Sequence, residues 1–338
     1  MKHIAAAARV DVSTVSLALR AHPSIPATTQ QRIRSVAERL GYRTNPLVRA
    51  LMIQRRTRSA SPYHGLIAYV TPHALDYDWR RVPSHASLFE GAQQQAHSLG
   101  FDLEHFSLTT PGMTDRRLSD ILRTRGVCGL VFAPLIEPRA PFDFDWASFA
   151  TAALNSPLES PPLDCVGPDH YQQMRLAFAR CRAYGYRRIG LTIRRNLSDV
   201  AEGRLLAAYN HEQALLPVRS RVPALIEHAE NSAVAPPGTA AWCNRYRPEV
   251  VLASTGANGA AWLRLLAKTR PKPALVSLAV DEHDGEIAGV FINAVQLGRM
   301  AIDVVAGHIL RNELGPLRAR RSHMLAGEWH DGRSCPPR

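Results

Sequence analysis

The sequence predicts a chain of two parts, an all-α head of three short helices and a larger α/β body built on parallel sheets. Three observations lead to this prediction. Apolar residues in the first 40 positions repeat with a helical period. From residue 65 onward, short apolar strands alternate with helical segments. The first 62 residues carry eleven Lys or Arg and two acids, a net charge of +9, whereas the other 276 residues carry only +3.

The head begins with two short helices joined by a three-residue turn. The apolar residues that share one face of the first helix are Ile4, Ala5 and Ala8. Asp11 closes the turn and can cap the second helix by accepting a backbone N–H. The second helix runs from Val12 to Arg20, and its inward residues are expected to be Val15, Ala18 and Leu19. Its outer face therefore carries small hydroxyls and aliphatic side chains.

A third helix is predicted from about Ala27 to Leu40, and Gly41 ends it as a left-handed cap would. Its inward residues are Ile33, Val36, Ala37 and Leu40. Two short helices, a tight turn and a bracing third helix describe a helix-turn-helix, whose second helix enters the major groove of DNA. Small hydroxyls can reach base edges and phosphates, and aliphatic tips can contact thymine methyls. The alternative is a three-helix bundle without a role on DNA, which the high positive charge of the head disfavours.

Residues 4–52 resemble the DNA-binding head of the lac repressor family of bacterial transcription regulators. The family pattern IA..A.VS..TVS.AL, a loop, and then T...I...AE.LGY.PN..AR.L is nearly all present. Three positions depart from it. Asp11 replaces a usual serine, Thr44 replaces a common proline, and Leu17 stands where many members place an arginine that reads a guanine. The last departure predicts a different operator sequence.

The resemblance implies roles for individual residues of the head. The positions expected to face the bases are Val12, Ser13 and Leu17. Those expected to hold phosphates are Thr14, Ser16 and Asn45, with Arg20 and His22 near the DNA backbone.

Residues 45–52, NPLVRALM, read as a very short helix, with Asn45 as its cap and Pro46 at its first position. Two turns of helix are not stable alone in water, so this segment has to fold against a partner. The resemblance implies a hinge helix that pairs with its twin in a homodimer, inserts Leu51 into the minor groove and places Arg49 beside it. The alternative is an ordinary linker that packs on its own domain. Residues 53–64 form a polar, basic connector.

The body, residues 65–330, alternates strands and helices. Strands are predicted at 65–71, 101–107, 126–135, 151–155, 187–193, 249–254, 274–280 and 322–329. Helices are predicted at 86–100, 116–125, 171–186, 204–216, 259–269 and 291–311. Repeated βα units favour parallel sheets covered by helices, and the length allows two such sheets. The resemblance implies two lobes like a periplasmic sugar-binding protein, with a small-molecule effector between them and dimerisation through the same domain.

Candidate effector residues come from two arguments. Open α/β sheets bind ligands at strand ends, which selects Tyr69 at the end of a strand and Asp169 and His170 at the start of a helix. The resemblance adds three residues at or beside the family's ligand positions, Arg204, Ser254 and Asn293. Four positions that are usually polar in sugar-binding members read Leu205, Ser254-Thr255, Ala279 and Ile292. Three alternatives follow: a ligand that is not a sugar, a shifted alignment, or a pocket that senses nothing.

Signatures of other function classes are missing from the sequence. It contains no P-loop, no GxGxxG after a strand and no HExxH, so we expect no enzyme, no cofactor and no metal site. The acidic stretches 281–286 and 142–146 are interpreted as surface loops. Five scattered cysteines without a CxxC pair, no signal peptide and no apolar run of membrane length indicate reduced thiols and a cytoplasmic location.

The sequence thus predicts a sequence-specific transcription regulator, a ligand-responsive repressor that binds a palindromic operator as a dimer. The alternative from a different class is a solute-binding module with a vestigial basic head. Only the first predicts DNA binding that weakens steeply with salt.

Overall fold

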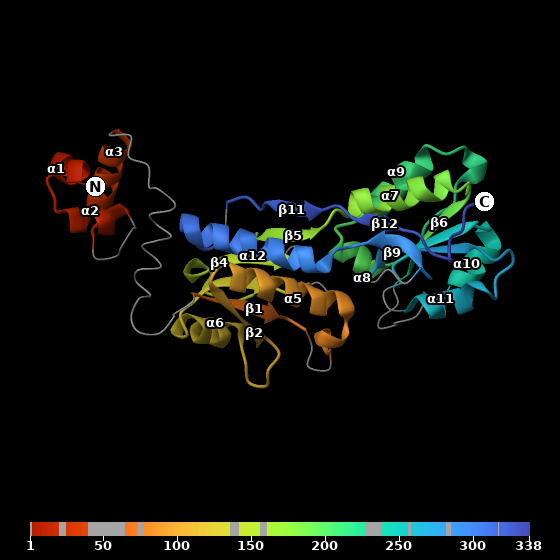
Figure 1. The fold of residues 1–338 in the computed structure, drawn as a ribbon, viewed down its shortest axis with the longest axis horizontal. Coiled ribbons are helices and arrows are strands. Elements are labelled where there is room, and N and C mark those ends of the chain that lie inside the picture. Colours follow the sequence, from red (N-terminus) through yellow and green to blue (C-terminus); the bar gives the residue numbers. More distant parts are fainter. Residues whose placement is uncertain are drawn as a thin grey trace. The chain divides into compact units, whose positions relative to one another are not determined.

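The computed structural model describes residues 2–19, 25–39, 65–73, 77–135, 142–155, 161–227, 238–255, 258–281, 285–316 and 318–338. The chain separates into two compact units, residues 1–63 and 64–338. The predicted hinge (45–52) and connector (53–64) lie outside the described residues. The domain boundaries expected from the sequence therefore remain predictions. Figure 1 shows the elements of both units along the chain.

The first unit contains the three helices expected of the head. They are α1 (Lys2–Ala8), α2 (Val12–Leu19) and α3 (Ala27–Arg39). The buried side chains that hold them together are Ile4, Ala5, Ala8, Val15, Ala18, Ile33, Val36 and Ala37. Each of these was predicted to face inward, so the helical periods are confirmed there. Leu40 and Gly41 lie outside the described residues, as does the side chain of Leu19.

The turn between α1 and α2 depends on one unusual backbone conformation. Arg9 has a φ of 51°, in the left-handed region that glycine favours. The Val10 N–H reaches back to the Ala5 carbonyl at 3.0 Å, and the Arg9 N–H donates to the Ala6 carbonyl at 3.3 Å. This is the bond pattern of a Schellman C-cap, in which Arg9 occupies the glycine position. The Asp11 carbonyl accepts the first bond of α2, from the Val15 N–H at 3.0 Å.

We expect Arg9→Gly to stabilise the head by about 1 kcal/mol, because glycine relieves the left-handed strain of a residue with a Cβ. Amide hydrogen exchange of Val15 and Ala18, which lie in the core of the head, measures the change. Arg9→Ala serves as the control, since it removes the same charge and keeps the Cβ. Equal protection in the glycine and alanine variants would contradict the strain argument.

Two six-stranded sheets form the second unit. The strands of the first are β1 (Gly65–Thr71), β2 (Phe101–Ser107), β3 (Val127–Phe132), β4 (Ala150–Leu154), β5 (Asp164–Pro168) and β11 (Ser322–Leu325), in the order β11-β5-β4-β3-β1-β2. The strands of the second are β6 (Ile189–Arg194), β7 (Leu225–Glu227), β8 (Val250–Ala253), β9 (Ala274–Val280), β10 (Ala288–Phe291) and β12 (Glu328–His330), in the order β12-β10-β9-β8-β6-β7. Every pairing is parallel except that of β10 with β12. The predicted fold class is confirmed.

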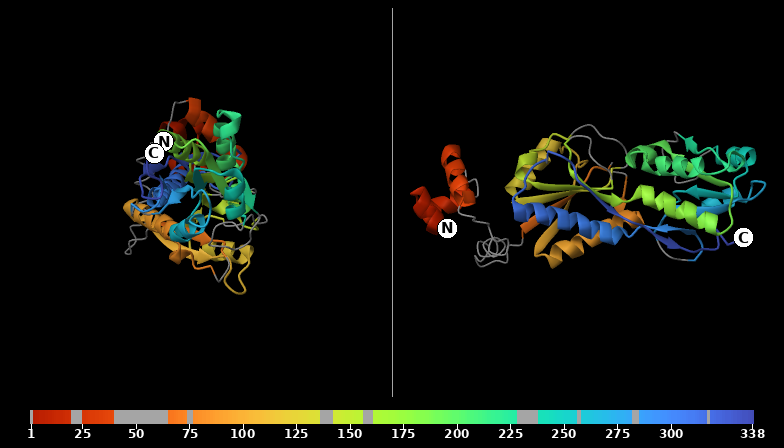
Figure 2. Two further views of the ribbon diagram at one scale, coloured as in Figure 1. Left: turned by 90° about the vertical axis from the view of Figure 1, so that its right-hand side faces the viewer. Right: turned by 90° about the horizontal axis from the view of Figure 1, so that it is seen from above.

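We call the first sheet and its helices lobe 1. The helices are α5 (Pro83–Ser98), α6 (Asp115–Thr124) and α12 (Ala294–Arg311). Helices α5 and α12 lie side by side on one face, where they bury Ile67 and Tyr69 of β1 (Figures 1 and 2). Helix α6 covers the other face, over Ala68 and Val70. This alternation along β1 is the period of a strand buried on both sides.

One predicted surface loop of lobe 1 is only half correct. In the stretch 142–146, Asp143 is exposed as expected. Phe142 and Phe144, however, are buried in the same core as Leu118 of α6. The two aromatic rings extend the cover that α6 gives this face of the sheet.

The described part of lobe 2 consists of the second sheet and five α-helices. They are α7 (His170–Ala183), α8 (Arg195–Val200), α9 (Arg204–Ala214), α10 (Thr239–Tyr246) and α11 (Gly259–Leu266). Helices α7 and α9 pack together on one face, through Phe178 and Tyr209. Helices α10 and α11 cover the other face, through Trp242 and Trp262. Each sheet is therefore enclosed on both sides, as parallel sheets require.

The chain passes between the lobes three times. Strand β5 leads into α7, β10 leads into α12, and β11 leads into β12. The sequence predicted a single strand at 322–329, but the structure divides it at Ala326-Gly327 and pairs the two halves in different sheets. A Cβ at Gly327 would lie 2.4 Å from Cγ1 of Val290, so only glycine fits this passage. The Asp169 N–H donates to the Leu325 carbonyl at 2.8 Å and joins two of the crossings.

Candidate nucleic-acid interface and effector site

The outer face of α2 is the candidate DNA-reading surface. Val12 is 43 % exposed, and Ser13 is exposed beside it at the helix N-terminus. Thr14 and Leu17 are half-buried. On the opposite face, the fully buried Val15 and Ala18 hold α2 against the other helices. The helix thus presents a hydroxyl and aliphatic tips outward while its apolar stripe anchors it.

The described head also exposes basic residues outside α2. Arg9 in the turn before α2, and Arg32 and Arg39 on α3, are all exposed. Exposed guanidinium groups are suited to phosphate contacts, which position a protein on a duplex without reading its sequence.

The other predicted DNA contacts fall where the structure gives no description. Arg20, His22, Asn45, Arg49 and Leu51 lie outside the described residues, as does the side chain of Ser16. The contacts assigned to individual residues of the head remain predictions.

Two of the predicted effector residues, His170 and Arg204, line one small cavity of about 10 Å³ at the lobe crossings. Lobe 1 contributes Asn155 and Cys165 to its wall, and lobe 2 contributes Glu202. The volume is that of a single water molecule. His170 Nδ1 hydrogen-bonds Oε1 of Gln173 at 2.9 Å, and burial lowers the pKa of His170, which leaves it a neutral imidazole near neutral pH.

The other candidates occupy separate positions. Asp169 and Asn293 are N-caps, because their Oδ1 atoms each accept a bond from the backbone N–H three residues later, at 3.0 Å. Ser254 directly follows β8 and is half-buried. Tyr69 is only 1 % exposed and packs between the rings of Trp79 and Phe89. The structure thus brings His170 and Arg204 together and places Tyr69 within lobe 1.

A cluster of aromatic and histidine side chains surrounds the carboxyl ends of β1 and β2. Its members, the strand-end cluster, are Tyr69, His73, Tyr77, Trp79, His85 and His105. The His73 and His85 rings stack with centroids 5.4 Å apart, and the Trp79 ring lies 5.3 Å from that of His105. His73 Nε2 donates to the Pro134 carbonyl at 2.8 Å. The Arg80 guanidinium lies 4.4 Å from the centroid of the Trp79 ring.

The histidines of the strand-end cluster are neutral near pH 7. Burial lowers the pKa of His85 to about 4, helped by the neighbouring His73. Burial and the charge of Arg80 lower the pKa of His105 to about 4. Neutral imidazoles can both donate and accept hydrogen bonds, and the rings offer faces for stacking.

Two buried polar atoms of the strand-end cluster, the Tyr69 hydroxyl and His73 Nδ1, have no hydrogen-bond partner among the described residues. Buried polar groups are nearly always paired, so these atoms mark the strand ends as a candidate contact for a ligand. Sequence reasoning selected Tyr69 and missed the other members. The strand-end rule that selected it also applies to His73 and His105, at the ends of β1 and β2.

Among the described residues, no group of three or more His, Cys, Asp or Glu is arranged to hold a metal ion. Within the same ranges, no helix combines the length and hydropathy of a membrane span. Residues 282–284 of the acidic stretch 281–286 are not described.

The family model described as "Bacterial regulatory proteins, lacI family" matches residues 1–45. This match confirms the resemblance that the head pattern indicated. The matched range covers α1, α2 and α3.

Curated relatives match a larger part of the chain at low identity. An "Uncharacterized HTH-type transcriptional regulator in aml 5'region" from Streptomyces limosus is 26 % identical over 196 residues, which are 56 % of this chain and 51 % of that protein. The "HTH-type transcriptional regulator MalR" of Streptomyces coelicolor is 25 % identical over 199 residues, 56 % of this chain and 52 % of the relative. The chain thus spans about half the length of the curated relatives it matches.

Solved structures share the fold of nearly the whole chain. A "transcriptional regulator CelR-cellobiose complex" superimposes with a TM-score of 0.60 at 19 % identity, over 96 % of each chain. The lac repressor dimer bound to operator and the anti-inducer ONPF gives a TM-score of 0.57 at 14 % identity, over 98 % of each chain. At these identities the likeness establishes the fold alone.

Proposed function

We propose that the chain is a sequence-specific DNA-binding transcription regulator, a ligand-responsive repressor that binds a near-palindromic operator as a homodimer. The observation that carries the proposal is the head. It matches the lacI family model, and α2 presents Val12 and Ser13 outward above a buried stripe. One such helix reads only a few base pairs, and a two-fold dimer doubles the site it recognises.

The ligand-responsive part of the proposal rests on the two-lobed body. Proteins of the same fold were solved with cellobiose and with the anti-inducer ONPF, which supports a small-molecule effector for this chain. Leu205, at a position where sugar-binding members usually carry a polar residue, is 3 % exposed in the core of lobe 2. This supports a ligand set different from theirs. A regulator that acts on chromosomal DNA works in the cytoplasm, where we place it.

Salt dependence of DNA binding separates this function from the alternative of a solute-binding module with a vestigial head. We expect the logarithm of the binding constant to fall steeply and linearly with the logarithm of salt concentration, and selection from random DNA to return a near-palindrome. Measurement by fluorescence anisotropy suffices. A flat salt response, or no enriched sequence, would favour the solute-binding alternative.

Leu17→Arg tests the reading face directly. We expect the variant to gain preference for a guanine at one position of each half-site, by about 1–3 kcal/mol for a good bidentate contact. Gln31→Arg is the matched control, because it adds the same charge at an exposed position of α3. The control should strengthen binding to all sequences alike. If the Leu17 variant kept the base preferences of the parent protein, α2 would not be the recognition helix.

A further inference from the structure

The two lobes touch directly beside β11, through charged side chains. Oε1 of Glu202, in the turn between α8 and α9 of lobe 2, lies 2.8 Å from Nη2 of Arg320, which immediately precedes Arg321 and β11 of lobe 1. Arg204 forms a second ion pair with Glu202, and its Nη1 lies 3.8 Å from Sδ of Met324 on β11. Glu202 and Arg320 are about two-thirds buried.

The lobe 2 end of this contact is held by its backbone. Glu202 has a φ of 50°, in the left-handed region, and Gly203 follows with a φ of 68°. The Glu202 N–H donates to the Asp199 carbonyl at 2.9 Å, and the Gly203 N–H to the Ser198 carbonyl at 2.8 Å. Ala201 is buried at 2 % exposure. The hydrogen-bonded turn therefore fixes the backbone of Glu202 and with it the direction of the Glu202 side chain.

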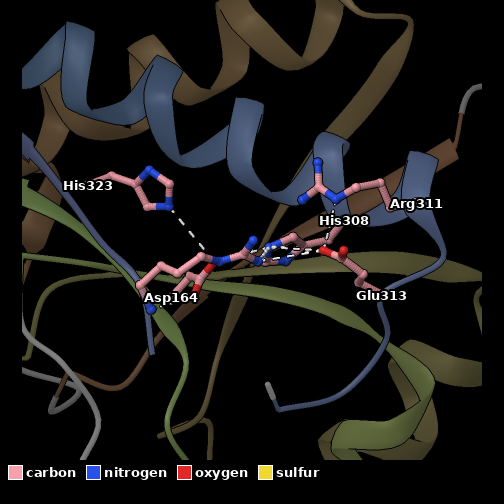
Figure 3. A network of polar contacts seen from close by, with 6 residues as sticks. Asp164, His308, Arg311, Glu313 and His323 are labelled. Atoms are coloured by element: carbon pink, nitrogen blue, oxygen red, sulfur yellow. Dashed lines mark hydrogen bonds and ion pairs between the residues drawn. The ribbon is translucent and has the colours of Figure 1, made fainter. Parts of the chain in front are cut away.

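The lobe 1 end is anchored by the next residue, Arg321, which joins a network of polar contacts around Asp164, His308 and Glu313. Figure 3 shows these three residues close together. The Arg321 N–H donates to Oδ1 of Asp164 at 2.8 Å, and its Nε donates to Oδ2 at 2.8 Å. The Asp164 carboxylate is fully buried and also lies 3.1 Å from Nε2 of His308 on α12. Oε2 of Glu313 completes the network, 3.5 Å from Nη2 of Arg321. Because Asp164 belongs to β5, these contacts tie the start of β11 to the interior of lobe 1.

Two consecutive arginines therefore form ion pairs with different lobes. Arg321 is bound to the buried acid of lobe 1, while Arg320 reaches out to Glu202 of lobe 2. A rotation of lobe 2 against β11 would break the Glu202–Arg320 pair without disturbing the Arg321 anchor. Through the described elements the chain connects the lobes at three crossings, so a contact beside them influences the angle between the lobes.

We propose that Glu202, Arg204 and Arg320 form an interlobe latch that holds the two lobes at one spacing along β11 and opens when the lobes rotate. The latch is a property of the body and needs no DNA. Its consequence for regulation rests on the proposed function, because it would set how readily an effector changes the lobe angle and thereby DNA affinity.

The distance between the lobes tests the latch. Spin labels are placed at Thr124→Cys on α6 and Arg219→Cys beyond α9, both exposed, with Cys128→Ser to remove the half-buried thiol. Excess unlabelled protein suppresses distances between copies of the chain. We expect Arg320→Gln to change the ratio of long to short label-to-label distances about two- to fivefold. This change corresponds to the free energy that an ion pair near the surface contributes. An unchanged distance distribution would overturn the proposal.

A matched control comes from an ion pair inside one lobe. Arg175 on α7 and Glu212 on α9 are 2.9 Å apart, and both helices belong to lobe 2. Arg175→Gln should leave the interlobe distances unchanged. In the otherwise unmutated labelled protein, raising the salt concentration should reproduce the Arg320→Gln shift, because salt screens a partly exposed pair. This second measurement does not depend on the folding of any latch variant, and insensitivity to salt would count against the latch.

DNA affinity is measured separately on the same variants. Interlobe distances that respond while operator affinity stays constant would support the latch and contradict the coupling in the proposed function. Absence of DNA binding by the parent protein would contradict the proposed function itself, and the distances alone would then decide the latch. A change in both supports the full regulatory scheme.

Discussion

Gly298→Ala is expected to destabilise lobe 1 by about 3 kcal/mol or more, because it separates two helices that touch through their backbones. A Cβ at Gly298 of α12 would lie 2.0 Å from the Leu88 carbonyl oxygen and 2.8 Å from the Ala92 nitrogen of α5. Gly91 of α5 stands in the reciprocal position, where a Cβ would lie 1.9 Å from the Val295 carbonyl oxygen. Backbone atoms cannot rotate away as side chains do. The helices must therefore move apart and lose the packing of Leu88 and Leu297.

Gly307→Ala, on the same helix, is the control for this prediction. The atom nearest to its added Cβ is Nη1 of Arg311 at 3.0 Å, the far end of a flexible side chain. We expect this variant to match the parent protein or to gain up to about 1 kcal/mol from the better helix propensity of alanine. Urea unfolding followed by circular dichroism gives both values. Equal stability of the two variants would show that the α5–α12 contact adapts, contrary to the rigid packing inferred here.

The contact between α5 and α12 shows what the periodicity of a sequence can predict and what it cannot. The helix predicted at 291–311 is observed at Ala294–Arg311, and Phe291 belongs instead to the preceding strand β10. Periodicity identifies the face that a helix buries, but it does not identify the element that covers it. That Gly298 meets the backbone of Leu88 and Ala92, more than 200 residues earlier, follows from the three-dimensional path of the chain and cannot be read from a local pattern.

Strands were predictable where they carry a continuous apolar run. The observed bounds of β1, β2 and β9 equal the predicted ones. Strand β5 was missed because its sequence, DCVGP, contains an acid and a proline. The acid is tolerated there because Arg321 and His308 satisfy the Asp164 carboxylate from other elements. Long-range partners thus permit a residue that local propensity disfavours.

The candidate sites also differ in how far the sequence predicts them. The reading face of α2 was predictable because a helix of eight residues presents its outer positions at fixed spacing. The interlobe latch was not predictable, because Glu202 and Arg320 are 118 residues apart. In the sequence each stands among charged neighbours, a pattern typical of ordinary surface residues. The strand-end cluster was partly predictable from the sequence. The rule that ligands bind at strand ends leads to Tyr69, and applied to the ends of both β1 and β2 it also leads to His73 and His105.

Lowering the pH from about 6.5 to 4 is expected to remove much of the stability of lobe 1 through the strand-end cluster. Burial holds the pKa of His85 and His105 at about 4, below the ordinary value of 6.5 that they regain on unfolding. Between these values the unfolded chain binds protons that the folded chain excludes, so acid favours unfolding. The contribution is fully present above about pH 6.5 and is lost as the pH falls toward 4. For His85 alone it amounts to at most about 3 kcal/mol.

Urea unfolding of the parent protein and two variants, measured between pH 7 and pH 4.5, tests this sign and its source. His85→Gln removes the titrating ring from the stack with His73, so its stability should fall less steeply with acid than that of the parent. His97→Gln, at an exposed position of the same helix α5, controls for the loss of a histidine as such. Acidic residues titrate in all three proteins alike, and the difference between the slopes isolates His85. Parallel slopes for the parent and His85→Gln would mean that this imidazole is protonated as easily in the folded protein as in the unfolded chain, which its burial against His73 and Tyr77 argues against.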